Sequence, residues 1–253
     1  GNGTSGVLIW GAQQERSSTV CPYIPTTTAA VYGPRFDHDP VSLACKGLLI
    51  EESRTNLLSF SESIADSAWA GFATASATNN QTTSPSGVAS SASRLTANAG
   101  TSTARTRVRL LTITTGGTAY STSAFIKAGS SSFGVVSMAF NKSGTGGVRN
   151  CDAHIVFSTG VVTQTGVLNA NFTVTSTAYP DGWYRITVSA TSNASTSVED
   201  QVVFVVGLSF NGVGGSGTFA GTETVFAWGA QLELGAFPTS YIPTTTASVI
   251  RSA

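Results

Sequence analysis

Apolar and polar residues alternate along most of the chain, and this two-residue period predicts β-strands rather than helices. The alternating runs recur at short intervals from about residue 90 onward, and they end in turn-forming residues such as Gly116-Gly117 or Pro180–Gly182. The runs predicted as strands are 90–97, 103–114, 119–128, 132–140, 151–158, 161–166, 171–179, 183–190, 200–210 and 222–233.

Strands at this spacing, with no helical pattern between them, are typical of a sandwich or a barrel. We predict an all-β fold, a two-sheet antiparallel jelly-roll sandwich with an extended N-terminal strand and connector. Residues 59–89 begin in a loop-like segment and continue into a stretch rich in Ser, Thr, Asn and Ala. We expect a short helical turn or a loop there.

One pattern occurs twice, near the two ends of the chain. Residues 225–249, VFAWGAQLELGAFPTSYIPTTTASV, align without a gap with residues 7–31, VLIWGAQQERSSTVCPYIPTTTAAV, and 14 of the 25 positions are identical. A match of this length indicates a duplicated module edge. Only one of the two copies can close the globular domain that lies between them.

The second copy is expected to form a strand followed by an extended strap. Phe226 and Trp228 fall on one face of the strand, and the residue before each falls on the other. Pro238 and Pro243 then interrupt any ladder, because proline has no N–H to donate. We predict that the strand closes the sheet with Trp228 in the core, and that Tyr241–Ile242 anchors the strap. A ligand platform at Trp228 is the alternative.

The duplication divides the chain into three parts. Residues 1–31 are the closing edge of a preceding module or an exchanged strand on another subunit, and the sequence leaves both alternatives open. Residues 32–58 form a connector, in which seven charged residues lie between Arg35 and Arg54. Residues 59–253 form the jelly-roll, carbohydrate-binding-like domain.

Composition narrows the function classes. Hydrophobic residues make up 41% of the chain, which is enough for a sizeable core, whereas charged residues make up only 10% and the formal net charge is zero. Nucleic-acid binding requires a basic surface, so it is not expected. No apolar run is long enough to span a membrane, and the N-terminus lacks the pattern of a signal peptide.

The residue types that usually carry catalysis or bind metals are sparse. Cys21, Cys45 and Cys151 match no zinc motif, and we expect all three to be reduced, in a protein assembled in a cytoplasm. Neither His38 nor His154 belongs to a nucleophile motif. Nothing points to the paired carboxylates of a glycosidase. We therefore predict no enzymatic activity and no cofactor.

Two charged groups in the connector could suggest a site. Asp37–Asp39 could suggest a metal site, and Glu51–Glu52 a carboxylate pair. Adjacent residues on an extended chain point to opposite faces, so neither group converges without special backbone geometry. We predict structural ion pairs instead, with Glu51–Glu52 bound to Arg54 or Arg35.

Several segments resemble a known family. WGAQLELGAFPTSYIPTT resembles the C-terminal edge of a jelly-roll module found in bacteriophage tail-fibre, spike and other virion adhesion proteins, and PRFDHDPVSLACKGLLIEESRTNLL is similar to the segment before that module. NLLSFSE, AFIKAG, FSTGVV and DGWYRITV are similar to carbohydrate-binding modules of the concanavalin-like jelly-roll type. The resemblance covers residues 7–253. The chain departs from a stand-alone carbohydrate-binding module because it starts with the closing edge of another module.

The resemblance implies a virion fibre or head-spike domain for host attachment through weak multivalent binding of bacterial cell-surface glycans. The implied partners are bacterial surface polysaccharide, other virion proteins and further copies of the chain, with a trimer favoured. Assembly would take place in the host cytoplasm, and the virion domain would act extracellularly. No membrane insertion is expected.

The related modules often hold a structural calcium, which no motif places on particular positions of this chain. The available oxygen donors are Asp66, Asp181, Glu199 and Asp200. Two other functions stay open: a purely structural fibre connector that binds no glycan, and a carbohydrate-binding accessory module of a secreted polysaccharide-degrading enzyme.

Three arginines form the most unusual local pattern. Alternation places Arg105, Arg107 and Arg109 on one face of one strand, about 7 Å apart. Three like charges at this spacing repel one another unless an anionic group lies across them. We predict that they bind an acidic glycan through their guanidinium groups. The alternative is pairing with neighbouring carboxylates, for which the candidates are Glu199, Asp200 and Asp152.

Two aromatic residues complete the predicted carbohydrate-binding site. Trp69 lies in a loop-like segment, where a role in the core is less assured than in a strand. Tyr120 shares a strand face with Thr122, Ala124 and Ile126, so packing in the core is the alternative for its ring. No metal-binding residue is predicted.

Overall fold

The computed structural model describes residues 9–12, 35–42, 44–71, 74–101, 104–144, 146–166, 171–214 and 217–251, with only the backbone described at 70–71, 104–110 and 146–148. The chain forms two units, Gly1–Ile50 and Glu51–Ala253. Residues 51–58, which we expected in the connector, therefore belong to the second unit.

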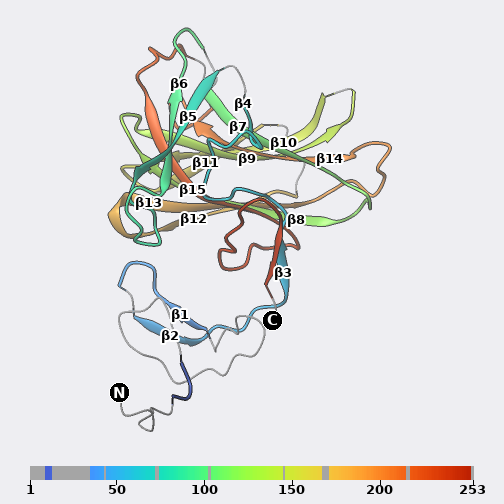
Figure 1. The fold of residues 1–253 in the computed structure, drawn as a ribbon. Helices are drawn as coiled ribbons and strands as arrows, with labels where there is room; N and C mark the ends of the chain where they lie inside the picture. The colour runs from blue at the N-terminus through green and yellow to red at the C-terminus, as the bar shows by residue number, and fades with distance from the viewer. Residues whose placement is uncertain are drawn as a thin grey trace, which may run out of the picture. The chain divides into compact units, whose positions relative to one another are not determined.

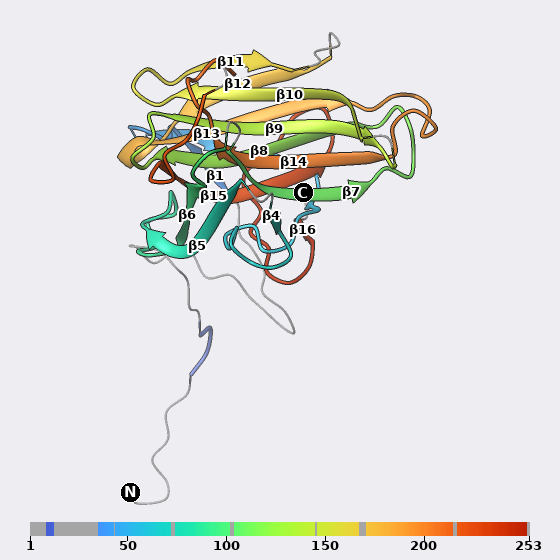
Figure 2. The ribbon, with the colours of Figure 1, turned by 90° about the horizontal axis from the view of Figure 1, so that it is seen from above.

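The second unit is a sandwich of two six-stranded antiparallel sheets (Figures 1 and 2). The β14 sheet contains, in spatial order, β11 (Val161–Thr165), β10 (Gly146–Val156), β9 (Phe133–Lys142), β14 (Gln201–Leu208), β7 (Ala104–Thr112) and β4 (Ala70–Gly71). The β15 sheet contains β12 (Thr173–Ala178), β13 (Trp183–Thr191), β8 (Ala119–Ala128), β15 (Thr224–Leu234), β6 (Ala92–Ala97) and β5 (Ala75–Thr82). The predicted all-β sandwich is confirmed.

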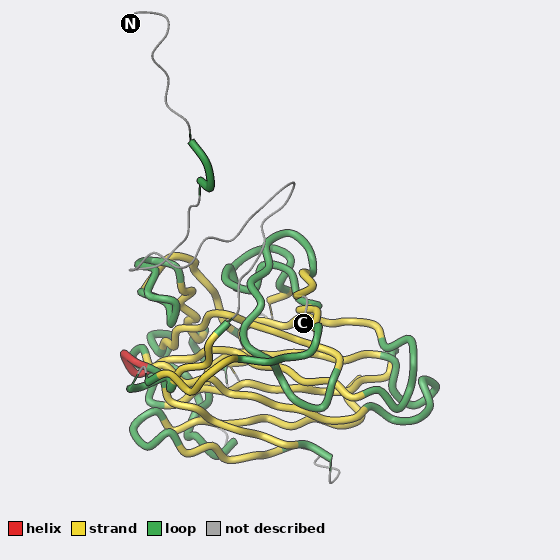
Figure 3. Tube along the Cα trace, turned by 90° about the horizontal axis from the view of Figure 1, so that it is seen from below, coloured by secondary structure: helices red, strands yellow, loops and turns green. Residues whose placement is uncertain are grey.

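Short elements complete the second unit. β3 (Arg54–Asn56) pairs with β16 (Val249–Arg251) beside the sandwich. A 3-10 turn, η1 (Pro180–Gly182), is the helical element of the described residues (Figure 3). No helix in the described part of the chain has the length and apolar character that crossing a bilayer requires.

The core lies between the two sheets because the inward positions of the central strands are apolar. Val202, Phe204 and Val206 alternate along β14 and are fully buried. On the facing sheet, Ile126 of β8 and Val225 of β15 are also fully buried. Burial of each such side chain contributes about 1.5–3 kcal/mol, so these alternating positions drive the two sheets together.

β15 lies between β8 and β6, and its register shifts once. The predicted division of residues between the two faces is confirmed, but the face of Val225 and Ala227 lies in the main core, and Trp228, which we expected there, lies in a second buried cluster on the outer face. The pairing with β8 then shifts at Gly229–Ala230, where Gly229 has a φ of +63°. Beyond this bulge the faces exchange, and Leu232 lies in the main core.

The strap after β15 covers the outer face of its sheet, as predicted. Tyr241 packs on Trp228 with ring centroids 4.6 Å apart, and Ile242 is buried. Glu233 is also buried, and it accepts hydrogen bonds from the Thr239 backbone N–H at 2.8 Å and the Thr239 hydroxyl at 2.6 Å. Paired in this way, a buried carboxylate fastens the strap to the strand.

The first unit contains a two-stranded ribbon of β1 (Phe36–His38) and β2 (Cys45–Leu48). Asp39 closes the turn by accepting hydrogen bonds from the backbone of Ser42 and Val41, and these lower its pKa to about 2. Lys46 approaches the same carboxylate at 3.4 Å. Most of the first copy of the duplicated edge lies outside the described residues, and its Trp10 is 84% exposed.

Candidate functional site

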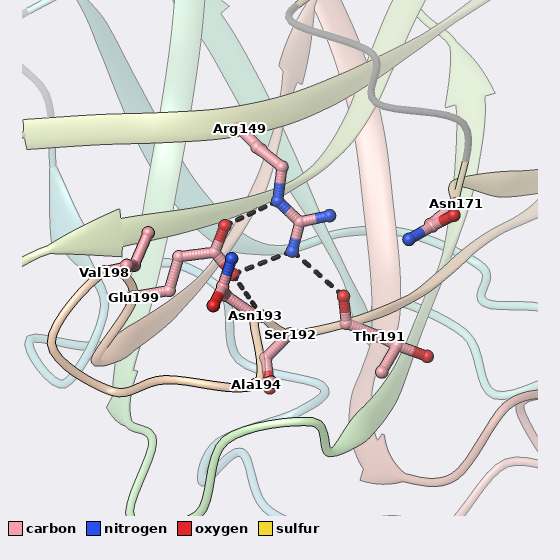
Figure 4. Close-up of a pocket in the computed structure, with 8 residues that line it drawn as sticks. All are labelled: Arg149, Asn171, Thr191, Ser192, Asn193, Ala194, Val198 and Glu199. Atoms are coloured by element: carbon pink, nitrogen blue, oxygen red, sulfur yellow. Dashed lines mark hydrogen bonds and ion pairs between the residues drawn. The ribbon is translucent and has the colours of Figure 1, made fainter.

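A polar pocket lies between the start of β10, the end of β13 and the loop that joins β13 to β14 (Figure 4). Its volume is about 400 Å³, within the range of small-ligand sites. The lining residues are Arg149, Asn171, Thr191, Ser192, Asn193, Ala194, Val198 and Glu199.

A buried ion pair forms one side of the pocket. Arg149 donates from Nε to Glu199 Oε1 at 2.5 Å and from Nη2 to Glu199 Oε2 at 2.7 Å. Nη2 also donates to the Thr191 carbonyl at 2.9 Å. The arginine is 6% exposed and the glutamate is fully buried. This two-point contact fixes the orientation of the guanidinium.

Hydrogen bonds and ring contacts surround the pair. Burial opposes ionisation of Glu199, but hydrogen bonds from Arg149 and from the Asn193 backbone N–H outweigh it, so the pKa of Glu199 lies below its ordinary value. The guanidinium lies 4.8 Å from the ring centroid of Phe140 and 5.8 Å from that of Phe172. Such cation–π contacts stabilise a cation away from water.

One guanidinium nitrogen remains available for a ligand. Nη1 donates to no atom of the described residues, and it points toward the Asn171 side chain (Figure 4). Asn171 and Asn193 add exposed amides. Planar groups of this kind can bind pairs of hydroxyls or a carboxylate. Glu199 is the single carboxylate among the lining residues, and it is committed to Arg149.

The predicted arginine site falls partly outside the described residues. Nothing is described of the side chains of Arg105, Arg107 and Arg109, so their binding of a glycan stays a prediction. In the backbone register, Arg107 and Arg109 are opposite Val206 and Phe204, and a bulge separates Arg105 from Arg107. The strict alternation on which the prediction depended is therefore interrupted.

The two predicted aromatic residues lie in the core, and their assignment to a glycan site is corrected. Trp69 is 1% exposed, packs on Phe204 at 5.7 Å, and donates its indole N–H to the Phe60 carbonyl at 3.1 Å. Tyr120 is 5% exposed and packs on Phe140, and burial raises its pKa. A ring buried on both faces cannot stack on a sugar.

The acidic residues considered from the sequence have structural partners. Glu199 binds Arg149, and Asp200 binds Lys142 at 2.8 Å. In the segment before the sandwich, Glu52 pairs with Arg54.

In the same segment, Glu51 lies 3.1 Å from Arg251.

Asp37–Asp39 does not form a metal cluster, and no group of three or more metal-ligating side chains occurs among the described residues.

Sequence reasoning missed the pocket. Arg149 is a single cation in the run GGVRNCDAHIV, and Asn171 belongs to an Asn-Phe-Thr triplet that is expected by chance in a chain rich in Ser and Thr. One feature of the sequence could have indicated the pocket. The adjacent acids Glu199 and Asp200 lie just before β14, and a carboxylate that becomes buried there needs a partner.

The solved structures that resemble the chain are distant from it in sequence. No family model and no curated protein sequence matches the chain. The chain is similar to the enzymatically active domain of bacteriophage CBA120 tailspike protein 4, with a TM-score of 0.39 and 9% identity over 71% of this chain and 21% of that chain. It is also similar to the CBM22-1–GH10 modules of Clostridium thermocellum endo-1,4-β-D-xylanase 10B complexed with xylohexaose, with a TM-score of 0.38 and 11% identity over 77% of this chain and 30% of that chain. The chain spans less than a third of either structure, and at these scores the likeness carries no argument about function.

Proposed function

We propose that this chain is a non-enzymatic β-sandwich domain of a virion fibre or spike, which attaches to the host by weak contacts with bacterial cell-surface glycans. The observation that carries the binding part is the pocket in which Arg149 Nη1 points toward the Asn171 side chain, with Asn193 among the other lining residues. Hydroxyl-rich sugars are suited to such fixed planar donors. The resemblance of the WGAQ and YIPTT segments supports the virion assignment.

Several copies of the chain would act together. A shallow pocket of polar groups gives a low affinity for one sugar, and linking identical sites raises the overall affinity without new contacts. A homo-oligomer, with a trimer favoured, therefore belongs to the proposal, together with other virion proteins as neighbours.

A glycan array with the purified chain, followed by calorimetry on the glycans that bind, tests this function. Asn171→Ala removes an exposed amide for which no protein hydrogen bond is described, so we expect several-fold weaker binding and unchanged stability. Gln81→Ala, which removes an exposed amide on β5, is the matched control. The proposal would be rejected if no glycan on the array bound. If Asn171→Ala bound glycans as tightly as the unmodified chain, the pocket would be rejected as the binding site.

A structural connector is the second candidate, and one observation favours it. Ile9 and Trp10 are 83% and 84% exposed, although the equivalent residues of the second copy, Ala227 and Trp228, are buried. Exposed apolar side chains at these two positions offer a surface for joining modules. Assembly that requires residues 1–31, together with a silent array, would support the connector.

A further inference from the structure

The outer face of the β15 sheet carries a row of cations and aromatic rings at one end. The register places Trp183 of β13 opposite Lys127 of β8, Lys127 opposite Phe226 of β15, and Phe226 opposite Arg94 of β6. Directly paired residues share one face of a sheet. Neighbouring strands are about 4.8 Å apart, so the four residues extend across roughly 14 Å.

Five other described cations are held in ion pairs, and Arg185 instead donates hydrogen bonds to the Ser123 hydroxyl and the Thr239 carbonyl. The described cations with an ion-pair partner are Lys46, Arg54, Lys142, Arg149 and Arg251. Within the described part of the chain, no carboxylate forms an ion pair with Lys127 or Arg94. Arg94 is exposed and Lys127 is half-buried. The row therefore presents two positive charges that no carboxylate of the described residues neutralises.

Aromatic packing fixes the position of the row. Lys127 Nζ lies 5.9 Å from the ring centroid of Trp183, in a cation–π contact. Trp183 is 1% exposed and donates its indole N–H to the Thr83 carbonyl at 3.2 Å. Phe226 packs against the second cluster on one side and remains half-buried. The ring of Phe226 is therefore partly exposed and lies between the two cations.

The two copies of the duplicated segment differ at the position of this ring. The first copy has Leu8 at the position of Phe226, whereas Trp10 and Tyr23 match Trp228 and Tyr241. Tyr241 of the strap packs on Trp228 of β15, so the contact that fastens the strap to the sheet uses residues that both copies share. The aromatic ring at position 226 is particular to the copy that lies in the row.

We propose that Lys127, Phe226 and Arg94 bind an acidic polysaccharide, with the ring under the sugar and the two cations on its carboxylates or sulfates. Sugar rings stack on aromatic faces while a guanidinium and an ammonium bind anionic groups. The inference rests on the proposed glycan-binding function and names the class of glycan. The row lies at the start of β13 and the Arg149 pocket at its end, so variants of the two sites can be separated.

The test compares the binding of oligogalacturonate, a chain of uronic acids, with the binding of its methyl ester. The ester keeps the sugar rings and removes the charges. We expect the free acid to bind and the ester to bind at least about tenfold more weakly, with an affinity for the acid that falls as salt rises. Arg94→Gln with Lys127→Gln should weaken binding of the acid about tenfold. Lys46→Gln, which removes an exposed cation of the first unit, should leave it unchanged.

Phe226→Leu introduces the residue that the first copy has at this position, and it removes the ring while keeping an apolar side chain. We expect weaker binding of the acid at an unchanged thermal midpoint. The proposal that the row binds an acidic polysaccharide would be overturned if acid and ester bound with equal affinity. It would also be overturned if the Arg94→Gln/Lys127→Gln variant bound the acid with full affinity. If that variant lost a salt-sensitive self-association of the chain and still bound the acid unchanged, the row would be a contact between protein chains instead. A protein that binds neutral glycans through Asn171 and ignores the acid would keep the proposed function and reject this inference.

Discussion

Arg149 shows how one buried cation fixes the end of the sandwich. Its guanidinium connects β10 to the last residue of β13 through the Thr191 carbonyl, and to the loop before β14 through Glu199. A lone charge in this position is unfavourable, because burial removes its hydration. The arginine and the glutamate therefore stabilise the fold only as a pair.

Replacing one partner of the pair should lower the free energy of unfolding more than replacing both partners. Arg149→Met leaves Glu199 buried without a counter-charge, and we expect the free energy of unfolding to fall by about 3 kcal/mol. Adding Glu199→Gln should restore part of that loss. Chemical denaturation at pH 7 measures both changes, and a double variant less stable than Arg149→Met would contradict this account.

The same pair makes stability depend on pH in a defined direction. The folded pKa of Glu199 lies below its ordinary value of 4.5, since the hydrogen bonds from Arg149 and Asn193 outweigh the opposing effect of burial. Its contribution is complete above pH 4.5 and is lost as the pH falls through the lowered folded value. The Arg149→Met/Glu199→Gln variant should lack this component of acid destabilisation.

Site residues could not be chosen reliably from residue type alone. Trp69 comes from a loop-like segment and still lies in the core, because Phe204 and the Phe60 carbonyl satisfy both its ring and its N–H. The pocket joins Arg149 and Asn171 to a loop near residue 193. That convergence depends on strand order, which local alternation does not specify.

At the scale of elements, Asn56 joins β3, β15 and the strap. Its amide donates to the carbonyls of Ala230 at 3.1 Å and Ile242 at 2.9 Å, and its oxygen accepts from the N–H groups of Leu58 and Leu232. The side chain is fully buried. All four contacts go to backbone groups that would otherwise lack partners.

Asn56→Ala should therefore destabilise the sandwich strongly. Four buried backbone groups lose a partner, and we expect a loss of about 3 kcal/mol in the free energy of unfolding. Thr55→Ala, in the same short strand, should change it by less than about 1 kcal/mol. Thermal and urea unfolding measure both. Similar losses in the two variants would show that β3 and not the amide is responsible.

The strands with apolar inward positions were predictable, and the exceptions have physical causes. β8 was predicted at residues 119–128, the bounds that it has. β5 was missed because ASATNNQT is polar on both faces and its pairing with β6 is irregular between Thr78 and Thr82. Strict alternation from Val225 would also place Glu233 inward, but the bulge at Gly229–Ala230 turns it outward.

At the scale of the whole molecule, the chain contains two units that use the same sequence motif differently. In the second unit Trp228 is 4% exposed under the strap, whereas Trp10 of the first unit is 84% exposed. Unit boundaries were less predictable than strands. The charged connector was expected to reach residue 58, but its last part pairs with the C-terminal segment through β3 and β16.

Tryptophan fluorescence should separate the two units. Trp69, Trp183 and Trp228 are 4% exposed or less, so acrylamide should quench mainly Trp10 in a dilute sample. Trp10→Phe should remove the readily quenched fraction and leave the thermal midpoint unchanged. A quenching profile that the substitution does not alter would contradict the exposure of Trp10. Protection that grows with protein concentration would indicate that copies of the chain cover this segment.

The central place of β15 has a consequence for how the chain is made. β15 lies between β6 and β8, yet the ribosome produces it long after both. Until then the nascent chain carries two unsatisfied strand edges with an empty slot between them, and such edges accept foreign strands. The chain itself supplies a competitor, because residues 7–31 carry the same Trp-Gly-Ala-Gln sequence and are translated before β15. Translation speed between β8 and β15 therefore sets how long correct closure competes with mispairing.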